Sequence, residues 1–209
     1  MKERRYNLSV KRFLAWVIAI AVAASILTVP QTESYAAGGK IKTIAVTNLP
    51  AKQLTLKKGK SFTLKTKVTA TGKISKKVAY KSSNKKVATV NAKGKITAKK
   101  KGTATITVYS KADKKKTCKI KVTVGTPVTK VKLNKTKANL NVGNSITLKT
   151  TLSPKKPSNK GIIWKSSNTK VATVTSKGVV KAKKAGTVKI TAKAKDGSGK
   201  KATVKIKIK

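Results

Sequence analysis

The sequence predicts an all-β protein with two tandem β-sandwich domains that follow an N-terminal export signal. Apolar residues recur with a period of two, turn residues separate the apolar runs, and one long segment is present twice. Thr and Val are frequent, and after Ala37 no stretch has the 3.6-residue period of an amphipathic helix. Together these observations indicate about seven short strands in each domain.

The N-terminal segment has the composition of a signal peptide. A basic stretch precedes an uncharged run of 17 residues, Phe13–Val29, and small residues at Ser34 and Ala36 suit cleavage between Ala36 and Ala37. We therefore expect a secreted protein that associates with the cell envelope. The alternative is an uncleaved signal anchor that tethers the chain to a membrane, because a run of this length is at the lower limit for a membrane span.

The internal repeat gives the domain boundaries. The sequence WKSSNTKVATV at 164–174 has a near-copy, YKSSNKKVATV, 84 positions earlier, and from Gly59 onward the two copies align without a gap. The opening strands match only if the first copy carries three extra residues near 48–52. The predicted boundaries are 1–36 for the signal peptide, 40–124 for the first domain and 127–209 for the second.

Within each copy, alternation places the strands and glycine marks the turns. Turn signals recur at Gly59, Gly94, Gly102 and Asp196-Gly197. Strands are predicted where apolar residues alternate with Lys or Thr, as at Phe62, Leu64 and Val68, at Ile146, Leu148 and Leu152, at Ala104, Ile106 and Val108, and at Val204, Ile206 and Ile208. Cys118 alternates in the same way with Ile120, so we expect its side chain to be buried as a small apolar group.

Large aromatic residues are few in the repeated region. Tyr80 and Trp164 occupy equivalent strand positions, and we expect each ring to anchor the core of its domain. Tyr109 is predicted to face outward, since it follows the inward Ile106 and Val108; its counterpart in the second copy is Lys193. A sugar- or base-stacking platform needs several exposed rings, which this inventory does not supply.

The repeat resembles the bacterial immunoglobulin-like domain, group 2. In the second copy the matching residues are Val131 and Leu133, Leu140 to Gly143, Leu148, Leu152 and Pro154, the W-x-S-S-N-x-x-V-A-T-V segment, Gly178, Val180 and Ala182, and Ala185 to Ala192. The first copy differs mildly, with Tyr80 for the tryptophan, Ala70 for the proline and Lys101 for the alanine before glycine. The resemblance implies immunoglobulin-like sandwiches and the spacer or adhesive roles of intimin- and invasin-like surface proteins.

Catalytic side chains are nearly missing beyond the leader. There the only acids are Asp113 and Asp196, histidine is absent, and Cys118 is the single cysteine. General acid–base catalysis needs a carboxylate or an imidazole, and a zinc site needs several His or Cys ligands. We therefore expect no enzymatic activity, no cofactor, no metal site and no small-molecule substrate.

Two short motifs resemble active-site signatures. Each copy contains S-x-x-K spacing, Ser83 with Lys86 and Ser167 with Lys170, as in penicillin-binding enzymes, but K-T-G is absent. We interpret Ser-Ser-Asn as a turn that is held by side-chain to backbone hydrogen bonds. Gly59-Lys60-Ser61 ends like a phosphate-binding loop but lacks the motif's first glycine, so it too is predicted to be a turn.

Lysine is the remaining signal for function. The net charge of +48 falls to about +45 without the five bases and two acids of the leader, and all remaining bases are lysines. A small domain needs a net charge of only about 2–8 for solubility, and a larger excess repels itself. Lysine without arginine favours diffuse point-charge attraction over bidentate phosphate recognition. The predicted contacts are Lys99, Lys100, Lys101, Lys114, Lys115, Lys116, Lys155, Lys156, Lys205, Lys207 and Lys209.

These charges predict a partner of opposite sign. The hypothesis is an exported, non-catalytic adhesion-type module pair that is held to anionic cell-wall polymers, an anionic membrane surface or acidic glycans, with no specific nucleic acid as partner. Two alternatives stay open. One is a purely structural wall-associated spacer or scaffold whose lysines only solubilise it, and the other is a secreted cationic protein that binds polyanions elsewhere.

Overall fold

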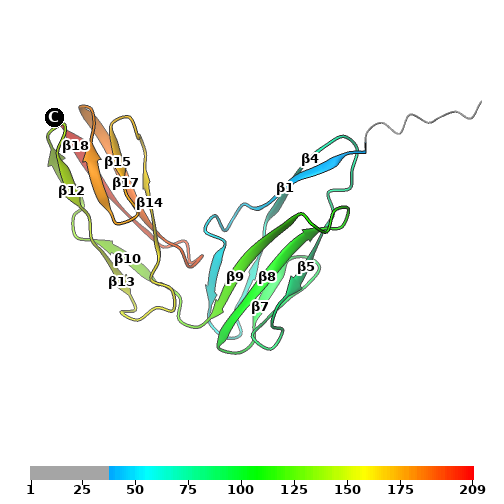
Figure 1. Cartoon of the computed structure of the whole chain (residues 1–209). Coiled ribbons are helices and arrows are strands. Elements are labelled where there is room, and N and C mark those ends of the chain that lie inside the picture. The colour runs from blue at the N-terminus through cyan, green and yellow to red at the C-terminus, as the bar shows by residue number, and fades with distance from the viewer. Residues whose placement is uncertain (1–37) are drawn as a thin grey trace, which may run out of the picture. The chain divides into compact units, whose positions relative to one another are not determined.

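The computed structural model describes residues 38–209, so the predicted signal peptide and its cleavage site lie outside the described residues. Residues Gly39–Lys209 form one compact unit, and all of its regular secondary structure is β-strand. The all-β prediction is therefore confirmed for this part of the chain. Figure 1 shows the two sets of strands, which are joined by the residues between β9 and β10.

The first domain has nine strands in three sheets. The strands are β1 (Lys40–Val46), β2 (Gln53–Leu56), β3 (Ser61–Thr63), β4 (Thr66–Thr71), β5 (Val78–Ser82), β6 (Ala88–Val90), β7 (Lys95–Ala98), β8 (Gly102–Ser110) and β9 (Thr117–Val124). The main sheet has the order β2-β9-β8-β5, with β2 parallel to β9. A second sheet has the order β3-β7-β6, and β1 pairs with β4.

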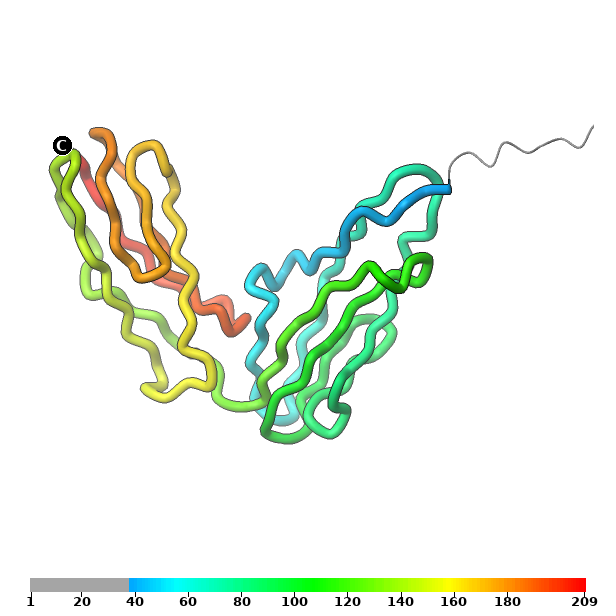
Figure 2. The backbone as a smooth tube through the Cα atoms, in the orientation of Figure 1, coloured from blue at the N-terminus to red at the C-terminus, as the bar shows by residue number. Residues whose placement is uncertain are grey.

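The second domain repeats this topology. Its strands are β10 (Lys130–Leu133), β11 (Lys137–Leu140), β12 (Ser145–Thr147), β13 (Thr150–Ser153), β14 (Ile162–Ser166), β15 (Ala172–Val174), β16 (Val179–Ala182), β17 (Gly186–Ala194) and β18 (Lys201–Ile208). The sheets are β11-β18-β17-β14, β12-β16-β15 and β10-β13. Figure 2 shows the long hairpin at the centre of each domain, β8–β9 in green and β17–β18 in orange to red.

Nine strands per domain exceed the seven that alternation predicts, in part because the chain changes sheets within the strand that is predicted at Phe62, Leu64 and Val68. β3 pairs with β7, but β4 pairs with β1, and the change falls at Leu64 and Lys65. There Leu64 N–H donates to the carbonyl of Gly94 while Lys65 N–H donates to Asn48 Oδ1. β1 and β2 also belong to different sheets, since β1 pairs with β4 and β2 pairs with β9. A hydrophobic period cannot reveal such a change of partner.

The insertion predicted for the first copy is confirmed at the connection between its first two strands. Residues 47–52 separate β1 from β2, whereas only 134–136 separate β10 from β11. The longer connection contains a turn in which Lys52 N–H donates to the carbonyl of Leu49, and Lys52 has a φ of 53°. Leu49 is buried at 1% exposure, so the insertion adds an apolar side chain to this end of the domain.

Each core lies between the main sheet and the smaller sheets. Ile106, Ile120 and Val122 from β8 and β9 are fully buried, as are their equivalents Ile190, Val204 and Ile206 in the second domain. Burying side chains of this size stabilises a fold by about 1.5–3 kcal/mol each. Cys118 is a free thiol at 3% exposure among these residues, which confirms the predicted burial. The opposite faces of the same strands are left for polar side chains.

Candidate functional site

The duplicated Ser-Ser-Asn segment is a turn in both domains. Ser82 Oγ donates to the carbonyl of Ala88 at 2.6 Å and accepts from Asn84 N–H. The second copy repeats this arrangement, with 2.7 Å from Ser166 Oγ to the carbonyl oxygen of Ala172. The buried serine thus closes the turn from inside.

The serine of each S-x-x-K pair also binds backbone. Ser83 Oγ accepts from Thr105 N–H at 2.8 Å, and Ser167 Oγ accepts from Lys189 N–H at 3.0 Å. Lys86 uses its backbone N–H to bind Asn84 Oδ1 at 3.0 Å. These bonds confirm the turn interpretation and tie the turn to the neighbouring strand.

The two aromatic residues pack over glycines. Tyr80 and Trp164 are partly buried and lie against the core clusters, Trp164 against two of them. A Cβ built on Gly178 would lie 2.8 Å from Trp164 Cζ2, and one on Gly94 would lie 2.9 Å from the Tyr80 hydroxyl. Both glycines have φ between +76° and +85°. Glycine is therefore required for the turn and for the close approach of the ring.

The outer face of the β11-β18-β17-β14 sheet gathers lysines from all four strands. Lysines alternate there with buried residues such as Val188 and Ile206. We call this surface the lysine face; its lysines are Lys137, Lys165, Lys189, Lys193, Lys201, Lys205 and Lys207. These four strands contain no acidic residue. Five of the seven lysines were not among the predicted contacts.

Three of these lysines form a row across the face. Lys205 is directly opposite Lys137 on β11 and directly opposite Lys189 on β17. All three side chains are exposed. Neighbouring strands lie about 4.8 Å apart, and like charges directly opposite each other destabilise a sheet. This central row therefore concentrates positive charge at an electrostatic cost.

The equivalent face of the first domain has a different composition. The positions that match the central row are Gln53, Lys121 and Thr105, in the same pairing. On the whole face only Lys81, Lys119 and Lys121 are lysines. Tyr109 is partly exposed there between Ala79 and Thr117, while its counterpart on the lysine face is Lys193. The same scaffold thus presents seven lysines in one copy and three in the other.

The other predicted contacts are exposed but belong to loops or to the end of β18. Lys99 to Lys101 precede β8, and Lys114 to Lys116 lie in the β8–β9 hairpin. Lys155 and Lys156 follow β13, where Lys155 and Lys160 line a shallow hollow with Thr150. Lys209 follows β18, and its N–H donates to the carbonyl of Leu140. Of the predicted contacts, only Lys205 and Lys207 lie within the lysine face itself.

Asp196 has a structural role that the sequence did not reveal. The Asp-Gly pair forms the predicted turn, but the Asp196 side chain is fully buried. One carboxylate oxygen accepts from Val128 N–H at 2.6 Å and the other from Ser198 N–H at 3.0 Å. Its backbone carbonyl accepts from Thr55 N–H of β2 at 2.7 Å. At the equivalent position the first copy has Ala112, so comparing the copies would have marked the site as different.

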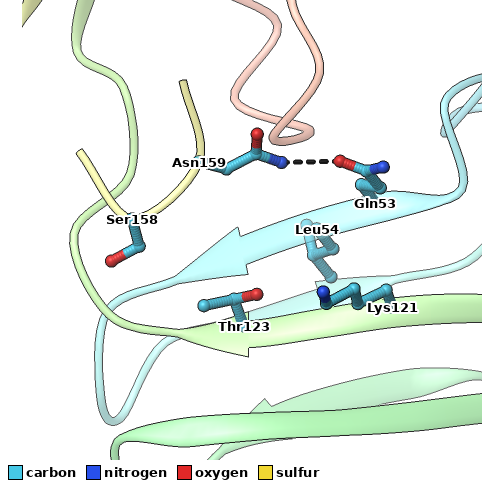
Figure 3. A pocket seen from close by; sticks show the side chains of 6 residues that line it. All are labelled: Gln53, Leu54, Lys121, Thr123, Ser158 and Asn159. Atoms are coloured by element: carbon cyan, nitrogen blue, oxygen red, sulfur yellow. Dashed lines mark hydrogen bonds between the residues drawn. The ribbon is translucent and has the colours of Figure 1, made fainter. Parts of the chain in front are cut away.

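A small hollow of about 170 Å³ lies close to this contact (Figure 3). Figure 3 shows Asn159 and Gln53 above Lys121 and Thr123, and Asn159 Nδ2 donates to Gln53 Oε1 at 2.7 Å. The two side-chain amides bind each other, and the Ser158 hydroxyl that also lines the hollow accepts from Thr126 N–H at 2.8 Å. We therefore interpret this hollow as part of the packing around β2.

Two further observations concern residues 38–209 alone. No three His, Cys, Asp or Glu side chains gather there closely enough to hold a metal ion. The same residues include no helix with the length and apolar character that a membrane crossing requires.

Short stretches of the chain are similar to parts of longer proteins. A stretch of 69 residues is 51% identical to part of the kappa-carrageenase of Pseudoalteromonas carrageenovora. This stretch covers 33% of this chain and 17% of that protein. A stretch of 72 residues is 40% identical to part of a 3-O-alpha-D-galactosyl-alpha-L-arabinofuranosidase of Bifidobacterium longum subsp. longum. It covers 34% of this chain and 6% of that protein. The chain thus matches only a small part of the length of these relatives, whose enzymatic names describe the longer proteins.

Comparison with solved structures and family models covers more of the chain. Domains 5-6 of the S-layer protein SbsC align with 82% of this chain and 99% of their own, at 20% identity and a TM-score of 0.36. A fragment of intimin aligns with 80% of this chain and 64% of its own, at 16% identity and a TM-score of 0.33. The model of the bacterial Ig-like domain (group 2) matches residues 42–120 and again residues 127–205. The chain therefore belongs to the family of bacterial Ig-like domains of group 2, as two tandem copies.

Proposed function

We propose that the two domains form an exported, non-catalytic binding unit that associates with the cell envelope through its lysines. The observation that supports this most strongly is the lysine face, with seven lysines and no acid on four adjacent strands. An uncompensated charge of this density destabilises a compact domain unless counterions or a polyanion screen it. The partner class that relieves this cost is an anionic polymer or surface.

Retention on an anionic matrix tests this proposal. The whole exported chain is passed over isolated bacterial cell wall and eluted at rising salt. We expect strong retention at about 50 mM salt that is lost by about 500 mM, because binding by counterion release weakens steeply with salt. Retention that salt does not weaken, or no retention, would contradict the proposal.

A structural spacer is the second candidate, and the linker contacts favour it. Gly125 N–H donates to the carbonyl of Leu56 in the first domain, while Thr126 N–H donates to Ser158 Oγ in the second. A linker that is bonded on both sides suits a unit that holds its neighbours apart. A spacer whose lysines only solubilise it predicts no salt-dependent retention, so the same column separates the two candidates.

The location of the protein distinguishes a third candidate, a cationic protein released from the cell. Fractionation of cells and medium, with and without a salt wash, measures where the chain is found. We expect it with the envelope before the wash and in the wash afterwards. Recovery from the medium alone would favour the released protein.

A further inference from the structure

Resting on the proposed function, we propose that the lysine face of the second domain is the docking surface, and that its partner is a flexible linear polymer with phosphate groups in its backbone. The central row of Lys137, Lys205 and Lys189 is the middle of this surface. The corresponding face of the first domain is not part of it.

Geometry gives the first reason. Three exposed lysines are directly opposite one another on three neighbouring strands, whose backbones lie about 4.8 Å apart. Lys207 extends the charge along β18, two residues from Lys205, or about 7 Å farther on. A partner with closely repeated negative charges can neutralise several of these lysines at once, which an isolated anion cannot do.

The shape of a β-sheet indicates which kind of polyanion fits. Adjacent strands rotate by about 20–25° relative to one another, so four strands do not present their lysines in one plane. A planar lipid surface therefore contacts only some of them. A flexible polymer follows the twist and contacts lysines on β11, β18 and β17 in succession.

The lysine face offers point charges and hydroxyls but no ring for stacking, which favours a phosphate polymer over an acidic sugar polymer. Lysine binds phosphate as a point charge, and hydroxyl groups donate hydrogen bonds to the phosphate oxygens. On the lysine face Thr191 and Thr203 are paired at 3.2 Å between their hydroxyl oxygens, and Thr187 is exposed beside Lys207. The single aromatic residue of these strands, Trp164, packs against the core clusters on the other side. The face thus has no ring on which a sugar could stack.

The matched test uses two triple variants of the whole exported chain. K137Q/K189Q/K205Q removes three charges from the lysine face, and K81Q/K119Q/K121Q removes three exposed charges from the equivalent face of the first domain. Binding to labelled linear inorganic polyphosphate is measured between about 50 and 300 mM salt, together with the unfolding midpoint of each variant, since polymer binding is strongly salt-dependent.

We expect the lysine-face variant to bind polyphosphate about 10- to 100-fold more weakly at about 50 mM salt. The slope of log binding constant against log salt concentration should become shallower by about 2, because each of the three lost contacts contributes roughly 0.7. The first-domain variant is expected to lose less than about threefold, through its lower net charge alone. Equal losses in the two variants would overturn the choice of face but leave the proposed function standing. Absence of salt-dependent binding to any polyanion by the unchanged chain would instead overturn the proposed function.

Two further probes test the choice of polymer. Polyglutamate supplies carboxylates on a flexible chain, and phosphatidylglycerol vesicles supply phosphates on a planar surface. We expect both to bind the unchanged chain more weakly than polyphosphate at equal charge concentration. Tighter binding of polyglutamate would overturn the assignment of phosphate, and tighter binding of the vesicles would overturn that of a flexible polymer.

Discussion

The two domains share their inner faces and differ on their outer ones. Ile106 and Ile120 of the first domain have Ile190 and Val204 as their equivalents, all fully buried. On the outer face, Gln53 and Thr105 are replaced by Lys137 and Lys189 on either side of a shared lysine position. Packing therefore fixes the inward positions of this scaffold, while the outward positions of each copy can acquire a separate role.

The ends of the domains differ as well. The first domain carries the insertion at residues 47–52, and the second carries Asp196 in its β17–β18 hairpin. A Cβ built on Gly197 would lie 2.7 Å from Leu49 Cδ1, so the hairpin packs closely on the insertion. Each copy thus contributes one specialised element to the contact.

Substituting the glycine that packs against each aromatic ring tests whether the two copies use the shared scaffold equally. Gly178→Ala should lower the free energy of unfolding by about 3–5 kcal/mol, because it adds a strained φ and a clash with Trp164 and the Leu148 carbonyl. Gly94→Ala should lower the free energy of unfolding by only about 1–3 kcal/mol. It adds the same backbone strain, but the new methyl group meets the outer end of the Tyr80 side chain and no backbone carbonyl. Urea unfolding measures both. A larger cost at Gly94 would contradict the packing described for the two rings.

The next effect concerns the contact that only the second copy makes. Asp196→Ala should cost about 2–3 kcal/mol, because Val128 N–H and Ser198 N–H lose their acceptor in a buried site. Asp113→Ala is the control: Asp113 Oδ1 accepts from Lys115 N–H in an exposed turn, and its loss should cost about 0.5 kcal/mol or less. Thermal unfolding compares the two. Equal small costs would show that Asp196 contributes nothing beyond an ordinary turn.

A smaller effect tests the duplicated turn. Ser82→Ala and Ser166→Ala should each cost about 1–2 kcal/mol, because a buried carbonyl loses its donor and an N–H loses its acceptor. The two costs should agree within about 0.5 kcal/mol, since the bonds are the same in both domains. Chemical unfolding of the two variants side by side would reveal any difference in how the copies use this turn.

The sequence predicts the repeated features well and the long-range pairings poorly. Alternation and turn residues identify the strands and the burial of Cys118, and comparison of the two copies reveals the three extra residues near 48–52. The central row depends on β11 being parallel to β18 in one register, and nothing local to Lys137 encodes that partner. Asp196 resembles an ordinary Asp-Gly turn, because its acceptor role depends on Val128, 68 residues away.

We expect the lysine face to lower the stability of the free protein and to restore that stability when a polyanion binds. The variant K137Q/K189T gives the second domain the first domain's row, and its unfolding is compared with that of the unchanged chain at about 20 mM salt, where charges are weakly screened. Without ligand the variant should be more stable by about 0.5–1 kcal/mol, because like charges no longer face each other. With polyphosphate present the order should reverse, because the unchanged chain binds more tightly and gains more. An equal gain in both proteins, or a variant that is less stable without ligand, would contradict the claim.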